Sequence, residues 1–362
     1  MSMTRGFVAL SCVFATAYAQ PAPQPLPPTQ MTTADFQAKV EAADGRVDFV
    51  PGNSAGALPY LSCHASTVLQ AADGTLMTAY FAGTDEGEND VGIWLSRYDG
   101  TKWSDAVRVA KVNETPHWNP VLFREPDAER IYLFFKIGPE IPFWQTYWMH
   151  SDDHGATWSD PLELVRNDKG GRGPVRCKPI VLSDGSWLAG ASSEYVKWLP
   201  FADRSYDKGV NWTRSMDFLT DPQTVRGAIQ PTLWESAPGK IYALLRTRGG
   251  FIGRTDSEDN GIIWSPVTLT TLPNPSAGVD VAKLADGRLL LMYNPVSKGR
   301  TPINLAMSKD NGLTWSDLVS LETEPGEYSY PAIITTDKGI AITYTWKRKL
   351  IRCWQVPNSV IE

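Results

Sequence analysis

The stretch Ser151-Asp152-Asp153-His154-Gly155-Ala156-Thr157-Trp158 decides the fold, because its pattern recurs along the chain. The pattern Ser-x-Asp-x-Gly-x-Thr-Trp returns in full at residues 308–315. Copies at residues 205–212 and 257–264 keep Ser, Asp, Gly and Trp, and a looser copy spans residues 96–103. The closing tryptophans lie roughly 50 residues apart, a period typical of repeat architectures, and they are Trp103, Trp158, Trp212, Trp264 and Trp315.

Each copy of this motif has the composition of a tight turn with a buried anchor. The Asp side chain caps nearby backbone groups, and Gly accepts positive φ. Ser and Thr add side-chain hydrogen bonds, while Trp places a large apolar ring beneath the turn. The motif therefore stabilises a fold, and we assign it no catalytic role.

Composition limits the class of protein. At 362 residues with 42% hydrophobic content, the chain can bury a large core. Length alone suggests about two domains, but stacked units of one kind make a single body, so we expect one domain over residues 32–362. The formal net charge is -6 and no run of Lys or Arg stands out. We therefore expect neither nucleic acid nor a membrane surface as a partner.

Residues 1–19 have the features of a secretory signal. Arg5 precedes an apolar stretch, and Ala17-Tyr18-Ala19 supplies a small-x-small cleavage pattern. Residues 20–31 are rich in proline and predict a stiff, extended linker. No later apolar run is long enough to span a bilayer. We therefore expect a secreted protein, either extracellular or periplasmic.

The cysteines and the metal-binding patterns limit the disulfides and metal sites that the chain could form. Cys12 lies in the predicted signal, which leaves Cys63, Cys177 and Cys353 and allows at most one internal disulfide. The sequence does not select the pair. Neither a Cys/His cluster with zinc spacing nor an EF-hand loop is present. We expect no cofactor and no metal in the active site, and the sequence leaves a structural calcium ion open.

A second turn precedes each Trp motif, and a β-rich segment follows each of these turns. The turns are Asp73-Gly74, Asp127-Ala128, Asp184-Gly185, Pro238-Gly239, Asp286-Gly287 and, without a later Trp motif, Asp337-Lys338-Gly339. Three or four strands in each of six units predict an all-β fold, a six-bladed β-propeller. The sixth unit lacks its last strand, and residues 46–50, after a short helix over residues 33–43, are the natural donor. Further N-terminal strands would make the number of blades seven.

In a propeller, the first strand of each blade lines the axis. The starts of these strands carry a polar residue before proline in four of the six units. Because unpaired polar groups are costly to bury, this recurrence favours a site at one mouth of the axis. The predicted polar ring consists of His64, Asn119, Lys178, Gln230, Asp280 and Tyr330.

Two arginines indicate what this mouth would bind. Arg246 ends the β-rich segment over residues 241–246, and Arg300 precedes the strand that leads to Ser308. Arginine binds carboxylates bidentately with a permanent charge, which suits an acidic sugar. Aromatic rings at the rim would stack on sugar faces, with Trp118 as the main candidate beside Trp144, Trp198 and Trp234.

Residues 58–356 resemble the sialidase superfamily, the six-bladed propellers with Asp-box repeats. That resemblance implies a glycosidase with a tyrosine nucleophile. Arg246 and Arg300 match two of the three family arginines that hold the substrate carboxylate. Tyr328 or Tyr330, in Glu327-Tyr328-Ser329-Tyr330, matches the nucleophile. Asp90 matches the acid/base aspartate, with Asp85 as second choice.

Two positions depart from the family pattern. Ser62-Cys63-His64-Ala65 stands where the first family arginine would lie. Gln230 replaces the glutamate that partners the tyrosine, and Glu235, five residues later, is a displaced substitute. Glutamine cannot accept a proton, so these departures bear on the reaction and leave the fold prediction intact.

Three functions follow from these observations. We expect a sialidase-like exo-glycosidase that acts on an acidic oligo- or polysaccharide, at a terminal carboxylated sugar. The first alternative is a lyase that performs β-elimination at a uronic acid, with His64 as the base or acid and Tyr330 or Lys178 assisting. The second is a glycan-binding propeller without catalysis. We expect a monomer in each case.

Overall fold

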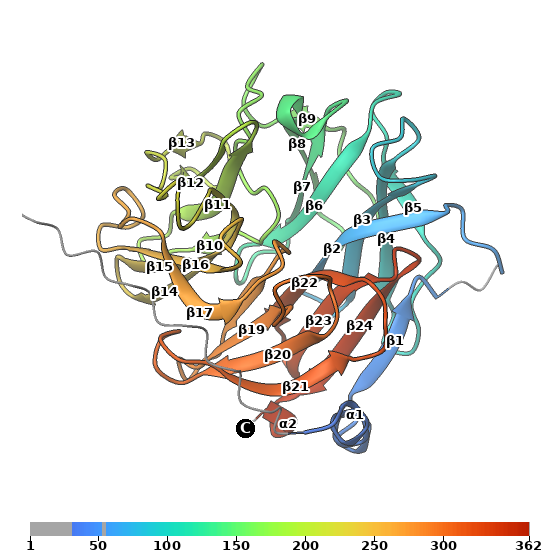
Figure 1. Ribbon diagram of the computed structural model, residues 1–362. Coiled ribbons are helices and arrows are strands. Elements are labelled where there is room, and N and C mark those ends of the chain that lie inside the picture. The colour runs from blue at the N-terminus through green and yellow to red at the C-terminus, as the bar shows by residue number, and fades with distance from the viewer. Residues whose placement is uncertain (1–30, 53–55, 362) are drawn as a thin grey trace, which may run out of the picture.

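Six four-stranded antiparallel sheets surround one axis, each forming a blade (Figure 1). The computed structural model describes residues 31–52 and 56–361. The predicted signal and all but the last residue of the predicted linker lie outside the described residues. The six-bladed prediction is confirmed, and the alternative of seven blades is wrong because the described N-terminal segment supplies one strand to an existing blade.

Each blade runs outward from the axis, from its first strand to its last. Blade A consists of β2 (Ser62–Gln70), β3 (Leu76–Gly83), β4 (Gly92–Tyr98) and β5 (Val107–Ala110). Blade B consists of β6 (His117–Arg124), β7 (Ile131–Ile137), β8 (Gln145–Ser151) and β9 (Leu162–Glu163). Blade C consists of β10 (Ile180–Val181), β11 (Trp187–Glu194), β12 (Trp198–Ser205) and β13 (Thr213–Arg214). Blade D consists of β14 (Ala228–Ala237), β15 (Lys240–Thr247), β16 (Phe251–Ser257) and β17 (Thr268–Pro273). Blade E consists of β18 (Asp280–Lys283), β19 (Leu289–Tyr293), β20 (Ile303–Ser308) and β21 (Ser316–Glu322). Blade F consists of β22 (Tyr328–Thr335), β23 (Gly339–Trp346), β24 (Leu350–Pro357) and β1 (Arg46–Val50).

Both ends of the described chain close the ring. Strand β1 pairs antiparallel with β24, from Arg46 opposite Gln355 to Val50 opposite Ile351, so the first strand lies beside the last (Figure 1). This confirms the predicted strand donation. Helix α1 (Thr33–Ala42), capped by Thr32, buries Phe36 and Val40 against blades E and F. Short helices η1 (Ile141–Phe143) and α2 (Asn358–Ile361) complete the described elements.

A bulge recurs near the start of four inner strands. The pairing of β2, β6, β14 and β22 with the next strand breaks after His64, Trp118, Ile229 and Ser329, respectively. The following residue has positive φ in every case, 57° at Ala65, 38° at Asn119, 57° at Gln230 and 52° at Tyr330. In three of the four, proline comes next, and its lack of an N–H suits an interrupted ladder. Bulges re-aim side chains, and those of Gln230 and Tyr330 bond to Glu194 and Arg246, respectively.

The repeated motif forms the turn that its sequence predicts. In the copy at residues 308–315, Ser308 Oγ accepts a bond from Gly312 N (2.8 Å), and Asp310 Oδ1 accepts one from Thr314 N (2.9 Å). The Trp315 indole then donates to Gly312 O (3.2 Å). Because these turns join the third and fourth strands, they lie at the opposite end of the blades from the bulges.

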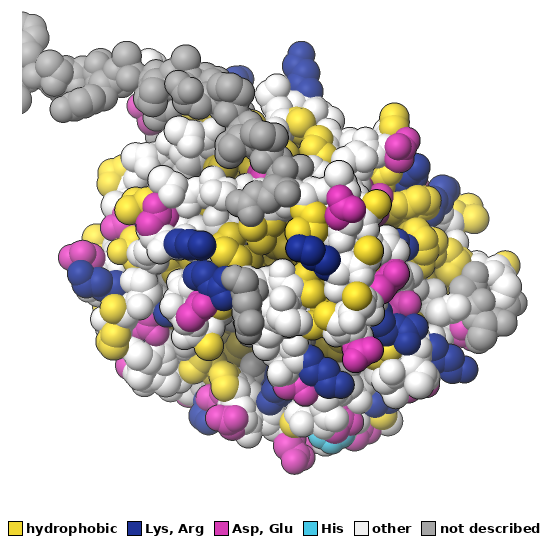
Figure 2. All heavy atoms as spheres, turned by 90° about the horizontal axis from the view of Figure 1, so that it is seen from below, with side chains coloured by type: hydrophobic (Ala, Val, Ile, Leu, Met, Phe, Trp, Pro, Cys, Tyr) yellow, Lys and Arg dark blue, Asp and Glu magenta, His cyan; other side chains and the backbone are white. Residues whose placement is uncertain are grey.

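The surface and the core agree with the composition. On the face shown in Figure 2, basic and acidic side chains are interspersed rather than segregated by sign. Cys63, Cys177 and Cys353 are buried free thiols, so none of them forms a disulfide. Within residues 31–52 and 56–361, no helix has the length and hydropathy needed to cross a membrane.

The turn bonds predict a measurable loss of stability. Asp310→Ala removes the acceptor for Thr314 and Ser308, which we expect to lower the free energy of unfolding by about 1 kcal/mol, as for a lost helix cap. Denaturant titration measures this loss. Lys309→Ala, an exposed change within the same turn, is the matched control and should leave the midpoint unchanged. Equal midpoints for the two variants would contradict a stabilising role.

Candidate active site at the leading ends of the inner strands

Tyr330 is the centre of a polar cluster at the mouth where the inner strands begin. Its hydroxyl accepts a hydrogen bond from Arg246 Nη1 at 2.7 Å. Its ring lies 4.2 Å from the His64 ring, centroid to centroid. The bulge in β22 aims Tyr330 here, and 9% of the residue remains exposed. Tyr330 is therefore a nearly buried phenol at the opening of the axis.

Three guanidinium groups surround the Tyr330 ring. The guanidinium carbons of Arg176, Arg300 and Arg246 lie 5.2, 5.5 and 6.0 Å from its centroid. Arg246 lies near the end of β15 and Arg300 lies between β19 and β20, as the sequence predicted for this mouth. Arg176, just before blade C, was missed because the comparison of the six inner-strand starts selected Lys178, two residues later. A cluster of permanent cations is suited to an anionic ligand.

Glu327 orients two of the cations at this mouth. Its Oε1 accepts bonds from Arg300 Nη1 (2.8 Å), Arg348 Nε (2.9 Å) and Ser329 Oγ (3.0 Å). Arg348 also donates to Glu86 in the loop between β3 and β4. The network thus joins blades E, F and A across the top of the site. It fixes one edge of each guanidinium.

Gln230 and Glu194 form the second polar pair. Gln230 Nε2 donates to Glu194 Oε1 at 3.3 Å, and Ser192 Oγ donates to the same oxygen at 3.0 Å. Burial raises the pKa of Glu194, an effect that the nearby Arg246 partly opposes. Sequence reasoning missed Glu194 because no repeat pattern marks the end of β11. It is the carboxylate bonded to the residue that replaces the family glutamate.

His64 lies beneath the mouth as a buried, neutral ring. Only 2% of it is exposed, and its Nδ1 is 2.9 Å from Thr345 Oγ1. Burial lowers its pKa well below the usual value, and the surrounding arginines, Arg348 foremost, lower it further. His64 is therefore uncharged near neutral pH and shielded from solvent.

Of the other residues predicted at this end, two lie on a surface loop and two are buried. Asp90 is exposed on the loop between β3 and β4, where its Oδ2 accepts bonds from Thr84 N (2.8 Å) and Oγ1 (2.6 Å). Asp85 lies on the same loop. Asn119 and Trp118 are buried at the start of β6, with the indole bonded to Gly138 O at 2.9 Å.

Tyr328, the other tyrosine candidate, lies in a different environment. It is 1% exposed and packs in the apolar core between blades E and F. Lys347 Nζ lies 5.9 Å from the centroid of its ring. The structure thus separates the two tyrosines, and only Tyr330 joins the arginine cluster.

Two members of the predicted ring, Lys178 and Asp280, do not lie at this mouth, which corrects the prediction. Lys178 Nζ donates to Asp280 Oδ2 (3.0 Å) and Val281 O (2.8 Å). Asp280 also accepts bonds from Thr232 Oγ1 (2.7 Å) and Ile333 N (2.9 Å), which makes it an internal link between inner strands. The inner strands of blades C and E lack the bulge, and without that extra residue the side chains face differently.

Glu235 also lies at the far end of the axis. It accepts bonds from Ser183 N (2.8 Å), Ser183 Oγ (2.9 Å) and Gly239 N (2.9 Å). Five residues carry β14 from the Gln230 end of the blade to the opposite one. Glu235 is therefore no substitute for the replaced glutamate.

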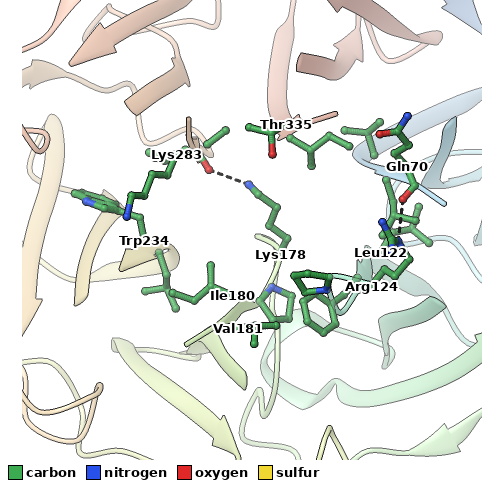
Figure 3. Close-up of a pocket in the computed structure, with 18 of the residues that line it drawn as sticks. Gln70, Leu122, Arg124, Lys178, Ile180, Val181, Trp234, Lys283 and Thr335 are labelled. Carbon is green, nitrogen blue, oxygen red and sulfur yellow. Dashed lines mark hydrogen bonds between the residues drawn. The ribbon is translucent and has the colours of Figure 1, made fainter. Parts of the chain in front are cut away.

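A cavity of about 530 Å³ opens at this far end, where the inner strands finish. Lys178 projects into it (Figure 3), and apolar side chains of all six inner strands form most of its wall. Its other cations also bond to backbone oxygens, Arg124 to Gln70 and Ala128, and Lys283 to Glu235. No group of three or more His, Cys, Asp or Glu suited to a metal ion occurs in the part of the chain that the structure describes.

The depressed pKa of His64 predicts a pH dependence of stability. As pH falls through about 6.5, the unfolded chain binds a proton at His64 that the folded chain does not, so the folded state loses stability. We expect wild type to lose about 2 kcal/mol more than His64→Phe between pH ~7 and ~5. Denaturant titrations at both pH values measure this difference. His117 titrates in both proteins and cancels, and parallel pH dependences would contradict the expectation.

Known proteins resemble the chain in sequence and in fold. The sequence matches the BNR repeat-like domain over residues 74–342. It is 25% identical over 303 residues to a sialidase of Micromonospora viridifaciens, which covers 77% of this chain and 45% of that protein. The chain thus spans less than half of that relative's length.

Solved structures share the fold at low identity. The Hadza microbial sialidase Hz136 aligns with TM-score 0.67 and 18% identity, over 82% of this chain and 66% of that chain. The NanB sialidase of Streptococcus pneumoniae gives 0.67 and 13%, over 82% and 68%. A Dyadobacter fermentans protein of unknown function gives 0.67 and 16%, over 82% and 95%. Since the family match covers most of the propeller, the chain belongs to the BNR repeat-like family, within the sialidase superfamily.

Proposed function

We propose that the protein is an exo-acting glycosidase that hydrolyses a terminal bond at a carboxylated sugar of an acidic glycan. The observation that carries this proposal is the environment of Tyr330, a phenol bonded to Arg246 and ringed by three guanidinium groups. Relatives named as sialidases support the reaction class. The signal-like first 19 residues support action outside the cytoplasm.

Arg246 and Arg300 would bind the sugar carboxylate. Arginine keeps its charge at all relevant pH values and offers paired N–H donors to a carboxylate. Glu327 holds Arg300 by Nη1 alone, so the rest of that guanidinium is free to turn to the ligand. Arg248, stacked 4.0 Å from the Trp198 ring centroid beside Arg246, extends the positive charge of the rim.

Tyr330 would act as the nucleophile. Its oxygen bonds to the anomeric carbon while the bond to the leaving oxygen breaks, and that oxygen takes a proton from Asp90. Glu194 accepts the proton of the Tyr330 hydroxyl, and its raised pKa makes it the stronger base. Water then attacks the anomeric carbon, Asp90 takes the water's proton, and the bond to Tyr330 breaks as the phenol oxygen takes back its proton from Glu194.

The departures from the family pattern bear on the substrate. No arginine stands at the start of β2, and Gln230 replaces a carboxylate. We therefore leave the substrate as a carboxylated sugar rather than sialic acid in particular. Elimination with His64 as base stays an untested prediction, and the burial of that ring disfavours it. A monomeric state also stays a prediction.

A panel of glycans tests the reaction class. We expect release of the terminal acidic sugar from sialosides or from glucuronate-terminated polysaccharides, with no new ultraviolet absorbance. Methyl esterification of the sugar carboxylate should reduce kcat/KM by at least about 10²-fold, because a charge-assisted pair with each arginine is lost. New absorbance would indicate an unsaturated product and a lyase. Binding without turnover would indicate a lectin.

Two single-atom changes test the nucleophile. Tyr330→Phe should lower kcat by about 10³-fold or more, as removal of a nucleophile does. Tyr328→Phe, two residues away in the core, should keep kcat near wild type. Steady-state kinetics with thermal melting separates chemistry from folding. Comparable losses in the two variants, or activity in Tyr330→Phe, would contradict the assignment.

A further inference from the structure

Arg176 crosses the axis of the propeller. It stands just before blade C, and only 2% of it is exposed. Its Nη2 donates to the backbone oxygen of Pro331 in β22 of blade F. Blades C and F are third and sixth in the ring and face one another across the axis (Figure 1). The guanidinium therefore lies against the blade opposite to its own.

Arg176 has no counter-charge within residues 31–52 and 56–361. Its Nε and Nη1 are buried without a hydrogen-bond partner, and no carboxylate oxygen lies within ion-pair distance of it among the described residues. Arg204, which is also buried, is paired with Asp184, and the half-buried Arg172 is paired with Asp203. An unpaired buried cation destabilises a fold. Fold stability alone does not account for Arg176.

The surroundings of Arg176 lead to Tyr330. Its guanidinium carbon is 5.2 Å from the Tyr330 ring centroid. Gly278 makes this approach possible, since a Cβ there would lie 3.3 Å from Arg176 Nε and 3.6 Å from Tyr330 Cδ2. Arg246 and Arg300 lie on the same ring, and His64 is neutral. Three positive charges therefore lie around the Tyr330 ring, and negative charge near the ring would reduce the repulsion among them.

We propose that Arg176 is a positioning residue whose permanent charge stabilises the negative charge that develops on the Tyr330 oxygen. The inference rests on the proposed function, in which Tyr330 is the nucleophile. A phenolate spreads its charge into the ring, so a cation at the ring acts on the oxygen without touching it. Within a water-excluded interior a charge about 5 Å away is weakly screened. Arg176 thereby supplements Glu194, the acceptor of the phenol proton in the proposed mechanism, whose carboxylate is bonded to Gln230.

The test compares Arg176→Met, Arg176→Lys and the distant, exposed control Arg130→Met, which lies near a repeated turn. We expect Arg176→Met to lower kcat by about 10²-fold, the size of a lost transition-state donor, with KM and inhibition by the released sugar within about 2-fold. Its melting temperature should be unchanged or higher, because a buried unpaired charge is gone. Arg176→Lys should recover at least about 10-fold of kcat, and Arg130→Met should match wild type.

Several outcomes would overturn the inference. A wild-type kcat in Arg176→Met would remove the role, and a raised KM alone would assign Arg176 to the sugar carboxylate. A fall in melting temperature that parallels kcat and is reversed by Arg176→Lys would indicate a structural residue. Arg176→Met should cost little in a Tyr330→Phe background, and an undiminished cost there would place its effect elsewhere. Wild type without glycosidase activity would refute the proposed function itself, together with this role.

Discussion

The pairing of β1 with β24 is the constraint on which the rest of the structure depends. Without it, blade F has three strands and an open edge, and open edges are prone to pair with other chains. With it, the six inner strands meet around one axis. The site requires that closure, because Arg246, Arg300 and Tyr330 belong to blades D, E and F, while Glu86 and His64 belong to blade A. No two neighbouring blades contain the whole cluster.

Within the closed ring, the bulges decide which way the polar residues face. An extra residue interrupts the pairing of β2, β6, β14 and β22, and a following proline suits the broken ladder in three of them. Gln230 and Tyr330 gain their positions in this way. Where the bulge is absent, in blades C and E, the corresponding polar groups pair with one another inside the axis. The presence or absence of a β-bulge thus distinguishes polar side chains that face the site from polar side chains that link the inner strands.

This distinction explains how far the sequence could predict the site. The two sets of repeated turns were enough for the fold, the number of blades and the strand exchanged between the ends, because these depend on local turn chemistry and repetition. Tyr330, Arg246 and Arg300 were predicted from their places in the repeat. Lys178 and Asp280 were misplaced because a bulge leaves no reliable mark in composition. Arg176 was missed because its side chain crosses the axis and contacts Pro331, more than a hundred positions away. Glu194 was missed because no repeat pattern marks the end of β11.

The two ends of the axis differ in how many of their cations are hydrogen-bonded or paired with a carboxylate. The far end has a cavity of about 530 Å³, and its cations are bonded: Lys178 to Asp280, Arg124 and Lys283 to backbone oxygens. The end with Tyr330 holds cations in excess, with Glu327 shared by two arginines and Arg176 unpaired. A group that is already satisfied gains little from a ligand, whereas an unsatisfied one gains the full interaction. Burial of unpaired arginines destabilises the fold. A bound anion or a developing phenolate offsets that free energy, so catalysis is favoured at the end of the axis where positive charge is in excess.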